Sequence, residues 1–408
     1  MSNTPSSAQF LSPQEDSLGD DAAAQAEGRS VLRAVERAIA ALRRAEIVII
    51  EDDAGPATAA LAVETATSSH LDELSTLTGV ALSLAITRQR AKILGLKPPH
   101  SFYDTPTSPY EEMVLTPRTE LTLSALAGIV IPTEESPTDA AVSSESWTIA
   151  SASPSVGAAV RLAKLARLLP ATVVAPAPPE ASRSSGGLVG WAVRHNVLTV
   201  RASEIDYYHI HAARTLQPVV EARVPLIHAE NARLIAFRPI DGGIEHLAIV
   251  IGTPDVSKPV LIRLHSECFT GDALGSLRCD CGDQLRGAIA GIAREGSGIL
   301  LYLAQEGRGI GLMNKLRAYR LQDAGADTID ANEHLGFEAD ERLYLPAIEM
   351  LRRLGVSRVR LMTNNPEKMR QLTDCGVEVV ERVPHIFPSN GHNETYLRVK
   401  AERGGHLF

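Results

Sequence analysis

Three cysteines, Cys268, Cys279 and Cys281, constrain this chain more than any other feature of its sequence. Ten spacer residues follow Cys268, and then comes Cys279-Asp-Cys281-Gly. Thiolates at this density are typical ligands of zinc, and a fold that uses them must bring the three sulfur atoms together. Structural zinc sites usually have four protein ligands, whereas three ligands leave one coordination position for water or substrate. The spacing therefore predicts a catalytic zinc site, which we favour over a redox pair or a chance cluster.

Composition and charge exclude several classes of protein. The net charge of −9 and the lack of a basic stripe argue against a nucleic-acid-binding protein. No apolar run approaches the ~20 residues that span a bilayer, so we expect no membrane partner. The first 28 residues contain no Lys, no Arg and no apolar core, which argues against a secretory signal. Because three of the four cysteines are assigned to a metal, we expect a reducing compartment and a cytoplasmic protein.

The length of 408 residues predicts more than one domain. Residues 1–28 are rich in Ser, Ala, Pro and acidic residues, and we expect a disordered tail there. Apolar residues at steps of three and four, from Leu32 to Leu42, predict a helix that begins near Arg29. We expect an α+β domain over 29–211, with helices at 71–77, 156–169 and 188–195, strands at 47–50, 80–86, 172–175 and 197–200, and a loop at 97–117.

A linker at 212–218 is predicted to separate this domain from a second domain over 217–408. Asn365-Pro366 has the residue types of a helix N-cap followed by the first helical position. Cys375 follows the helix predicted there, and we interpret it as a packing residue because single cysteines are often buried. The pattern predicts a layered α/β domain with a mixed sheet, with strands at 222–237, 246–251, 259–264, 299–303 and 359–362 and helices at 283–294, 311–322 and 346–354.

Several motifs of the second half, matching in order and spacing over residues 217–408, resemble GTP cyclohydrolase II, the first enzyme of riboflavin synthesis. The motifs are Arg263-Leu-His-Ser-Glu-Cys-Phe-Thr-Gly-Asp-Ala-Leu, Leu277-Arg-Cys-Asp-Cys-Gly-Asp-Gln, Gln305-Glu-Gly-Arg308, Asn314-Lys-Leu-Arg-Ala-Tyr319, Gly325-Ala-Asp-Thr328, Asp340-Glu-Arg342 and Thr363-Asn-Asn-Pro-Glu-Lys368. The resemblance implies a homodimer that converts GTP to 2,5-diamino-6-ribosylamino-4(3H)-pyrimidinone 5′-phosphate, formate and pyrophosphate. It also implies one zinc ion per subunit and magnesium on the triphosphate.

The same resemblance implies roles for individual residues. Asp340 and Arg342 match the pair assigned to general base and nucleophile at the α-phosphate, and Tyr319 matches a further active-site residue. Because a guanidinium stays protonated with a pKa above ~12, electrostatic stabilisation is an alternative role for Arg342. On their own, Asp340 and Arg342 would be a surface ion pair, and Tyr319 one aromatic residue on an amphipathic helix. The residues matching substrate-binding positions are Arg263, Leu264, His265, Ser266, Glu267, Gln284, Glu306, Gly307, Arg308, Thr328, Thr363 and Lys368.

The chemistry of GTP ring opening can be assigned to these residue types. Water must attack C8 of the guanine, and zinc lowers the pKa of bound water to roughly 7 in favourable sites. Three thiolates donate charge and weaken this effect, so we expect a nearby base to help. Glu267, beside a ligand, either assists proton transfer or supports the site as an outer carboxylate. Loss of pyrophosphate needs positive charge and magnesium at the leaving oxygens, which fits Arg308 and Lys368 as well as Arg263.

The first half resembles 3,4-dihydroxy-2-butanone 4-phosphate synthase in the order of its elements and in Ala41-Leu-Arg-Arg-Ala-Glu-Ile-Val-Ile-Ile-Glu-Asp-Asp53. That family uses an acidic loop after this strand to hold magnesium and a sugar phosphate, but residues 54–60 contain no carboxylate. Pro154-Ser-Val156 stands where the family has His-Thr-Glu. Since magnesium requires hard oxygen ligands, we predict a domain that kept the scaffold and lost the activity.

Two other functions remain open for the whole chain. One is a non-catalytic nucleotide-binding or scaffold protein in which both halves have lost activity. The three clustered cysteines, Asp340 and Arg342 argue against it, because a decayed site rarely keeps every chemical group. The other is a related cyclohydrolase recruited to pyrimidine catabolism, which the sequence does not separate from the riboflavin enzyme.

Overall fold

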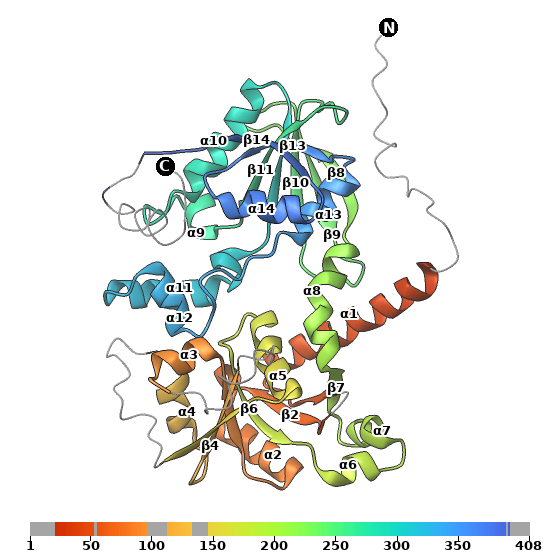
Figure 1. The fold of residues 1–408 in the computed structure, drawn as a ribbon, viewed down its shortest axis with the longest axis vertical. Coiled ribbons are helices and arrows are strands. Elements are labelled where there is room, and N and C mark those ends of the chain that lie inside the picture. The colour runs from red at the N-terminus through yellow and green to blue at the C-terminus, as the bar shows by residue number, and fades with distance from the viewer. Residues whose placement is uncertain (1–20, 53–54, 97–111, 133–145, 389–390, 392–408) are drawn as a thin grey trace. The chain divides into compact units, whose positions relative to one another are not determined.

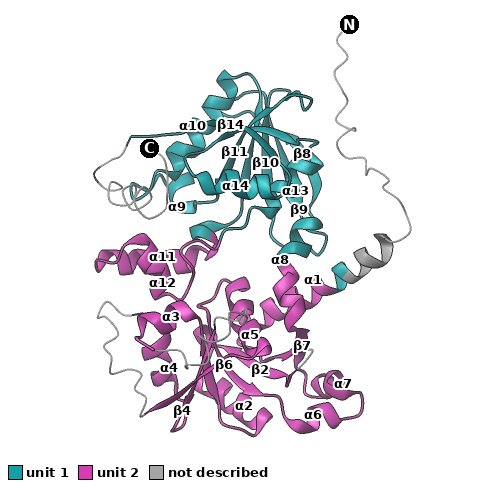
Figure 2. Ribbon diagram, viewed as in Figure 1, with its two compact units in different colours: residues 1–30, 209–308, 342–408 teal, residues 31–208, 309–341 magenta. Residues whose placement is uncertain are grey.

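The computed structural model describes residues 21–52, 55–96, 112–132, 146–388 and 391 (Figure 1). The chain divides into two compact units, each built from separate stretches of sequence (Figure 2). Unit 1 consists of Met1–Ser30, His209–Arg308 and Arg342–Phe408, and unit 2 consists of Val31–Tyr208 and Gly309–Glu341. The segment 309–341 therefore folds with the first half of the chain, although the sequence placed it inside a second domain over 217–408.

A seven-stranded sheet with the order β5-β4-β3-β6-β2-β1-β7 forms the framework of unit 2. β1 and β7 pair in parallel, whereas all other neighbouring strands pair antiparallel. All five residues of β2 are buried, and side chains alternate between faces along a strand, so this sheet is covered on both faces. The strands are β1 (Val48–Glu51), β2 (Thr58–Ala62), β3 (Ser83–Ile86), β4 (Met113–Pro117), β5 (Trp147–Ser151), β6 (Ala171–Pro176) and β7 (Leu198–Arg201).

Local sequence explains where the helices around this sheet form. The apolar residues at three- and four-residue steps between Leu32 and Leu42 are buried along α1. The side chain of Thr67 caps the start of α2, and Gly79 ends that helix in the left-handed conformation. None of the helices in the described part of the chain is both long enough and apolar enough to cross a membrane. The helices are α1 (Asp21–Arg43), η2 (Val63–Thr65), α2 (Ser68–Thr78), α3 (Arg88–Ile93), α4 (Leu123–Val130), α5 (Pro154–Leu165), α6 (Pro179–Arg183), α7 (Gly187–Arg194), α8 (Ala202–Arg214), α11 (Leu312–Asp323) and α12 (Thr328–His334).

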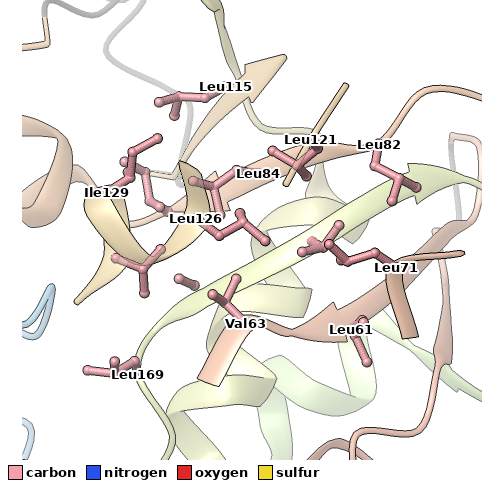
Figure 3. Close-up of a cluster of buried hydrophobic side chains, with 14 of the residues drawn as sticks. Leu61, Val63, Leu71, Leu82, Leu84, Leu115, Leu121, Leu126, Ile129 and Leu169 are labelled. Carbon is pink, nitrogen blue, oxygen red and sulfur yellow. The ribbon is translucent and has the colours of Figure 1, made fainter. Parts of the chain in front are cut away.

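A hydrophobic cluster packs one face of this sheet against several helices. Leu61 and Leu84 contribute to it from strands and Leu126 contributes from α4 (Figure 3). The segment 309–341 shares this cluster, because α12 packs on α3 and places apolar side chains among the same residues. The members from this segment are Ile310, Ala318, Leu321, Ala331, Leu335 and Phe337.

The sheet of unit 1 also has seven strands, in the order β14-β13-β11-β12-β10-β9-β8. Neighbours from β14 to β12 pair in parallel, and neighbours from β12 to β8 pair antiparallel. The strands are β8 (Gln217–Arg223), β9 (Ala232–Arg238), β10 (His246–Ile251), β11 (Val260–Ser266), β12 (Gly298–Leu303), β13 (Arg358–Met362) and β14 (Glu378–Val383). The helices are α9 (Phe269–Asp272), α10 (Cys281–Arg294), η4 (Glu306–Gly309), α13 (Leu345–Arg353) and α14 (Pro366–Asp374).

Helices cover both faces of this second sheet. Ile262 of β11 packs in one core with Leu351 of α13 and Leu372 of α14. The neighbouring Leu261 points to the other face and packs with Ile292 of α10. The predicted fold class is therefore confirmed: α+β organisation in the first half and a layered α/β domain with a mixed sheet in the second.

Several local expectations differ from the structure. Helix α1 begins at Asp21 rather than near Arg29, and the predicted tail before Asp21 lies outside the described residues. Residues 113–117, predicted as loop, form β4 because they pair with both β3 and β5, while 97–111 are not described. The linker predicted at 212–218 is replaced by the end of α8 at Arg214 and the start of β8 at Gln217. Cys375 is exposed after α14, so its interpretation as a packing residue is wrong.

Candidate metal centre and active site

Parallel strands of unit 1 bring most of the predicted site residues to one edge of the sheet. β11 lies between β12 and β13 and is parallel to both. The carboxyl ends of these strands therefore meet at one edge, where open α/β sheets bind ligands. The predicted residues at this edge are Arg263, Leu264, His265, Ser266 and Glu267 at the end of β11, Glu306, Gly307 and Arg308 after β12, and Thr363 and Lys368 after β13.

The three cysteines predicted to bind a metal form one cluster in this unit. The Sγ atoms of Cys268, Cys279 and Cys281 lie within 4.8 Å of one another, and those of Cys268 and Cys279 are 3.7 Å apart. Two sulfurs that bind one tetrahedral ion at about 2.3 Å lie about 3.8 Å from each other, so the observed separation suits ligands of a single ion. In the described part of the chain this is the one group of three or more His, Cys, Asp or Glu side chains placed to hold a metal.

Gly271 makes room for this cluster. A Cβ atom at Gly271 would lie 2.8 Å from the Sγ of Cys279 and 3.1 Å from the Sγ of Cys268. It would also lie 3.0 Å from the Cβ of Cys281. Contacts under about 3 Å are too close for carbon and sulfur, so a side chain at this position would push the sulfurs apart. The backbone of α9 thus forms a cradle around the three sulfur atoms.

The proximity of the sulfurs changes their acidity. Hydrogen bonding with the Cys268 sulfur, together with burial, raises the pKa of Cys279 to about 11. Hydrogen bonds with Cys268 and Cys279, together with burial, also raise the pKa of Cys281. Crowded thiols keep their protons because neighbouring thiolates repel, and a divalent cation removes that penalty. The donor set therefore fits a thiolate-binding metal ion.

Asp272, which was not among the predicted site residues, holds the loop that carries Cys268. Its carboxylate accepts hydrogen bonds from the backbone N–H of Cys268 at 3.0 Å and from the hydroxyl of Tyr302 at 2.9 Å. His265 Nε2 lies 3.1 Å from both carboxylate oxygens, and both side chains are buried. Burial lowers the pKa of His265, which favours a neutral ring that donates its Nε2–H to Asp272. The sequence signals for Asp272 are its place four residues after Cys268 and its position in the motif that begins at Arg263.

Glu306, predicted to bind substrate, is buried and contacts backbone beside the cysteine cluster. Its Oε2 accepts a hydrogen bond from the N–H of Phe269 at 2.6 Å, and its Oε1 accepts one from the N–H of Gly307 at 2.8 Å. Gly307 and the following Arg308 both have a φ of 64°. A residue with a Cβ rarely adopts this left-handed conformation, so the turn at Arg308 is held by its surroundings.

Two of the predicted phosphate-binding cations, Arg263 and Lys368, also join neighbouring elements. The guanidinium of Arg263 donates to the carbonyl of Met362 at 2.8 Å and to Gln284 Oε1 at 2.5 Å. Burial lowers the pKa of Arg263 to about 10. The Nζ of Lys368 donates to the carbonyl of Leu264 at 3.0 Å. These bonds connect β11 with β13, α10 and α14, and so they define the shape of the strand-end site.

The turn into α14 has the cap predicted from sequence. The Asn365 side chain accepts a hydrogen bond from the N–H of Glu367 at 2.9 Å, and Pro366 occupies the first helical position. The hydroxyl of Thr363 accepts a hydrogen bond from the N–H of Asn365 at 3.0 Å. Thr363 is thus positioned by the same turn that starts α14.

The remaining predicted residues are divided between the units. Tyr319 lies on α11, Thr328 is the first residue of α12, and Asp340 is exposed in the stretch that follows α12. These three residues belong to unit 2, whereas Arg342 begins the stretch that returns to unit 1.

A family model and several curated proteins that match this chain all carry the name GTP cyclohydrolase II or GTP cyclohydrolase-2. The family model of GTP cyclohydrolase II matches residues 217–384. The chain is 57% identical over 379 residues to GTP cyclohydrolase-2 of Azospirillum brasilense, which covers 93% of this chain and 95% of that protein. It is 60% identical over 166 residues to GTP cyclohydrolase-2 of Azotobacter vinelandii, covering 41% of this chain and 80% of that protein. It is 54% identical over 193 residues to GTP cyclohydrolase-2 of Shigella dysenteriae, covering 47% of this chain and 98% of that protein.

Similarity to solved structures is much weaker. A two-domain 3,4-dihydroxy-2-butanone 4-phosphate synthase from A. baumannii is 17% identical and has a TM-score of 0.36, covering 87% of this chain and 99% of that chain. The synthase of Candida albicans is 16% identical with a TM-score of 0.32, covering 43% of this chain and 96% of that chain. TM-scores this low do not define the fold of unit 2, which is established by its own strands and helices.

Proposed function

Since the chain belongs to the GTP cyclohydrolase II family, we propose that it converts GTP to 2,5-diamino-6-ribosylamino-4(3H)-pyrimidinone 5′-phosphate, formate and pyrophosphate in riboflavin biosynthesis. One water adds at C8 and a ring C–N bond breaks, a second water hydrolyses the resulting formamide to formate, and a third cleaves the bond between the α- and β-phosphates. The observation that carries this proposal is the cluster of Cys268, Cys279 and Cys281 beside the carboxyl ends of β11, β12 and β13.

The residues of the site have distinct tasks in this reaction. The three cysteines would hold one zinc ion per subunit, which would lower the pKa of water for ring opening and for hydrolysis of the formamide. Glu267, directly before Cys268, moves protons between water and the ring nitrogen. Arg308 and Arg342 stabilise the charge that develops on the triphosphate, to which magnesium is bound.

A direct assay tests this function. Purified protein is incubated with GTP, zinc and magnesium, nucleotide products are separated by chromatography, and formate and pyrophosphate are quantified. We expect one formate and one pyrophosphate for each GTP consumed. Binding of GTP without release of either product would instead support a nucleotide-binding scaffold.

Asp272→Asn is expected to weaken zinc binding about 10- to 100-fold, the range found when a group that orients a metal ligand is removed. The amide can still accept one hydrogen bond, but it lacks the charge that balances the buried N–H of Cys268 and the hydroxyl of Tyr302. Competition with a coloured zinc chelator measures the affinity. Asp283→Asn is the control, because Asp283 is exposed on α10 and forms an ion pair with Arg286. Equal affinities for the parent protein and Asp272→Asn would exclude this role of Asp272.

The first half of the chain is expected to have no synthase activity. Residues 58–62 form the buried strand β2, and residues 55–60 contain no carboxylate that could bind magnesium. The relative from Azospirillum brasilense that shares both halves is named GTP cyclohydrolase-2 alone. Ribulose 5-phosphate with magnesium should therefore yield no dihydroxybutanone phosphate from a preparation that is active on GTP. If the parent protein forms this product and a variant with a substitution within 29–210 does not, the first half has synthase activity and the prediction is wrong.

We also propose a homodimer that works in the cytoplasm, as the family resemblance implies. Sedimentation of the full chain at micromolar concentration distinguishes a dimer from a monomer. The roles proposed for the metal and substrate residues depend neither on the dimer nor on the cytoplasmic location.

A further inference from the structure

We infer that residues 31–208 act as a platform that positions the segment 309–341, and through it Tyr319, Thr328 and Asp340, for turnover of GTP. The inference rests on the proposed function, because the resemblance to GTP cyclohydrolase II is what assigns these three residues to its active site and substrate. It assigns a task in GTP hydrolysis to a half of the chain that is proposed to have no reaction of its own.

The segment 309–341 shares the hydrophobic core of unit 2 with the first half of the chain. Leu335 and Phe337, in the turn that follows α12, are buried at 2% and 1% exposure in the cluster that contains Leu126 and Ile129 of α4. Helix α12 packs on α3, so its apolar residues are covered by the first half of the chain. The segment 309–341 thus completes the core of unit 2.

Buried hydrogen bonds fix the end of α12 on this core. The guanidinium of Arg90 donates to the carbonyls of His334 and Ile129, each at 2.7 Å. The hydroxyl of Thr87 donates to the carbonyl of Gly336 at 2.7 Å. A Cβ at Gly336 would lie 3.0 Å from that hydroxyl, and the residue has a φ of 87°, so the approach is close because Gly336 has no side chain. The chain that leads to Asp340 therefore starts from a rigid point.

Helix α11 is held in a similar way near Tyr319. The Nδ2 of Asn314 donates to the carbonyl of Arg167 at 3.0 Å. Arg317, two residues before Tyr319, forms an ion pair with Glu64 at 2.8 Å. Because Asn314 and Arg317 both lie on α11, these contacts set the rotation of the helix that carries Tyr319.

The stretch that carries Asp340 is held by an ion pair. The Nζ of Lys164, on α5, lies 2.8 Å from Oε1 of Glu341, and both side chains are mostly buried. The same oxygen accepts a hydrogen bond from the N–H of Glu338 at 2.8 Å. The side-chain amide of Gln89 donates in turn to the carboxylate of Glu338. Lys164 and Gln89 thus position the two residues that bracket Asp340.

Exchange of the charges at 164 and 341 in the full chain tests the inference. Lys164→Glu and Glu341→Lys are each expected to lower kcat for formate release by about 10- to 100-fold, since misplacement of a reacting group by about 1 Å can cost about 100-fold. The double variant restores the attraction and should recover most of the parent kcat. Zinc content and the midpoint of thermal unfolding are measured for all variants, so that loss of folded protein is separated from loss of positioning.

Arg161→Met serves as the matched control. Arg161 lies one turn earlier on α5 and pairs with Glu112 and Asp206, both within 31–208. This variant removes two ion pairs of the same helix, neither of them with the segment 309–341, and its kcat should equal that of the parent. A parent-like kcat for Lys164→Glu, or a double variant no better than the single variants, would overturn the inference.

Hydrogen–deuterium exchange separates this inference from the proposed function. Amides within 338–341 should exchange faster in each single variant and return to the parent rate in the double variant, whether or not GTP is present. Unchanged exchange in the single variants would count against the platform. A parent protein that releases no formate from GTP would contradict the proposed function, while the exchange rates would still decide whether residues 31–208 position the segment.

Discussion

Replacement of Cys279 by serine is expected to abolish formate release from GTP. The buried Cys279 sulfur lies 3.7 Å from that of Cys268, and a hard hydroxyl is a poor replacement for a soft thiolate at a zinc site. A catalytic metal lowers the activation barrier by several kcal/mol, so we expect formate release to fall by about 1000-fold or more. Because the thiols are not assigned to cleavage of the triphosphate, pyrophosphate release should persist at a reduced rate.

Cys375→Ser provides the matched control for this variant. The substitution is chemically the same, but Cys375 is exposed after α14 and outside the cluster. Zinc content is measured by elemental analysis, formate by a coupled dehydrogenase assay, and nucleotides by chromatography. A Cys279→Ser protein with stoichiometric zinc and the parent rate of formate release would refute the metal assignment.

A shortened chain that begins at Gln217 is expected to keep its zinc and lose most of its GTP turnover. All three cysteines belong to unit 1, so the metal-binding cluster does not depend on the first half. The shortened chain would expose Leu321, Leu335 and Phe337, which the first half covers in the full chain. Burial contributes about 1.5–3 kcal/mol for a side chain of this size, so these three together lose roughly 5–9 kcal/mol.

This loss is comparable to the whole stability of a typical domain, which is about 5–15 kcal/mol. We therefore expect the segment 309–341 to lose its fold and kcat to fall at least about tenfold, in line with the rate lost when a reacting group is misplaced. Zinc content, kcat and sedimentation are compared for the two chains at matched concentration. A shortened chain that keeps the parent kcat would show that residues 217–408 suffice, as the 193-residue match to the Shigella protein allows.

The metal cluster was predictable because its signal is local. Cys279 and Cys281 are separated by one residue, and a ten-residue spacer connects them to Cys268. A short stretch of chain can therefore bring all three sulfurs to one metal ion. Thiolates are soft ligands, and they favour zinc over hard cations such as magnesium. The helix cap at Asn365 was predictable for the same reason, because a cap depends on neighbouring residues alone.

Some elements and residue roles could not be predicted from the sequence, because they depend on contacts between distant parts of the chain. Residues 113–117 read as part of a proline- and threonine-rich loop, yet they form β4 between two partner strands. Helix α12 is short, with seven residues, and too short for a clear apolar periodicity. Asp272 stands in a recognised motif, but its role depends on Tyr302, thirty residues further along the chain.

The sequence by itself determined the family, the candidate metal ligands and the mixture of helices and strands in both halves. These properties follow from residue chemistry, motif spacing and periodicity within short windows. Only the tertiary structure decided that the segment 309–341 folds with the first half of the chain. That choice depends on contacts such as Lys164 with Glu341 and Thr87 with Gly336, which are separated by 177 and 249 residues. Periodicity shows that a helix has an apolar face, but the partner for that face is selected by the shape of the assembled core.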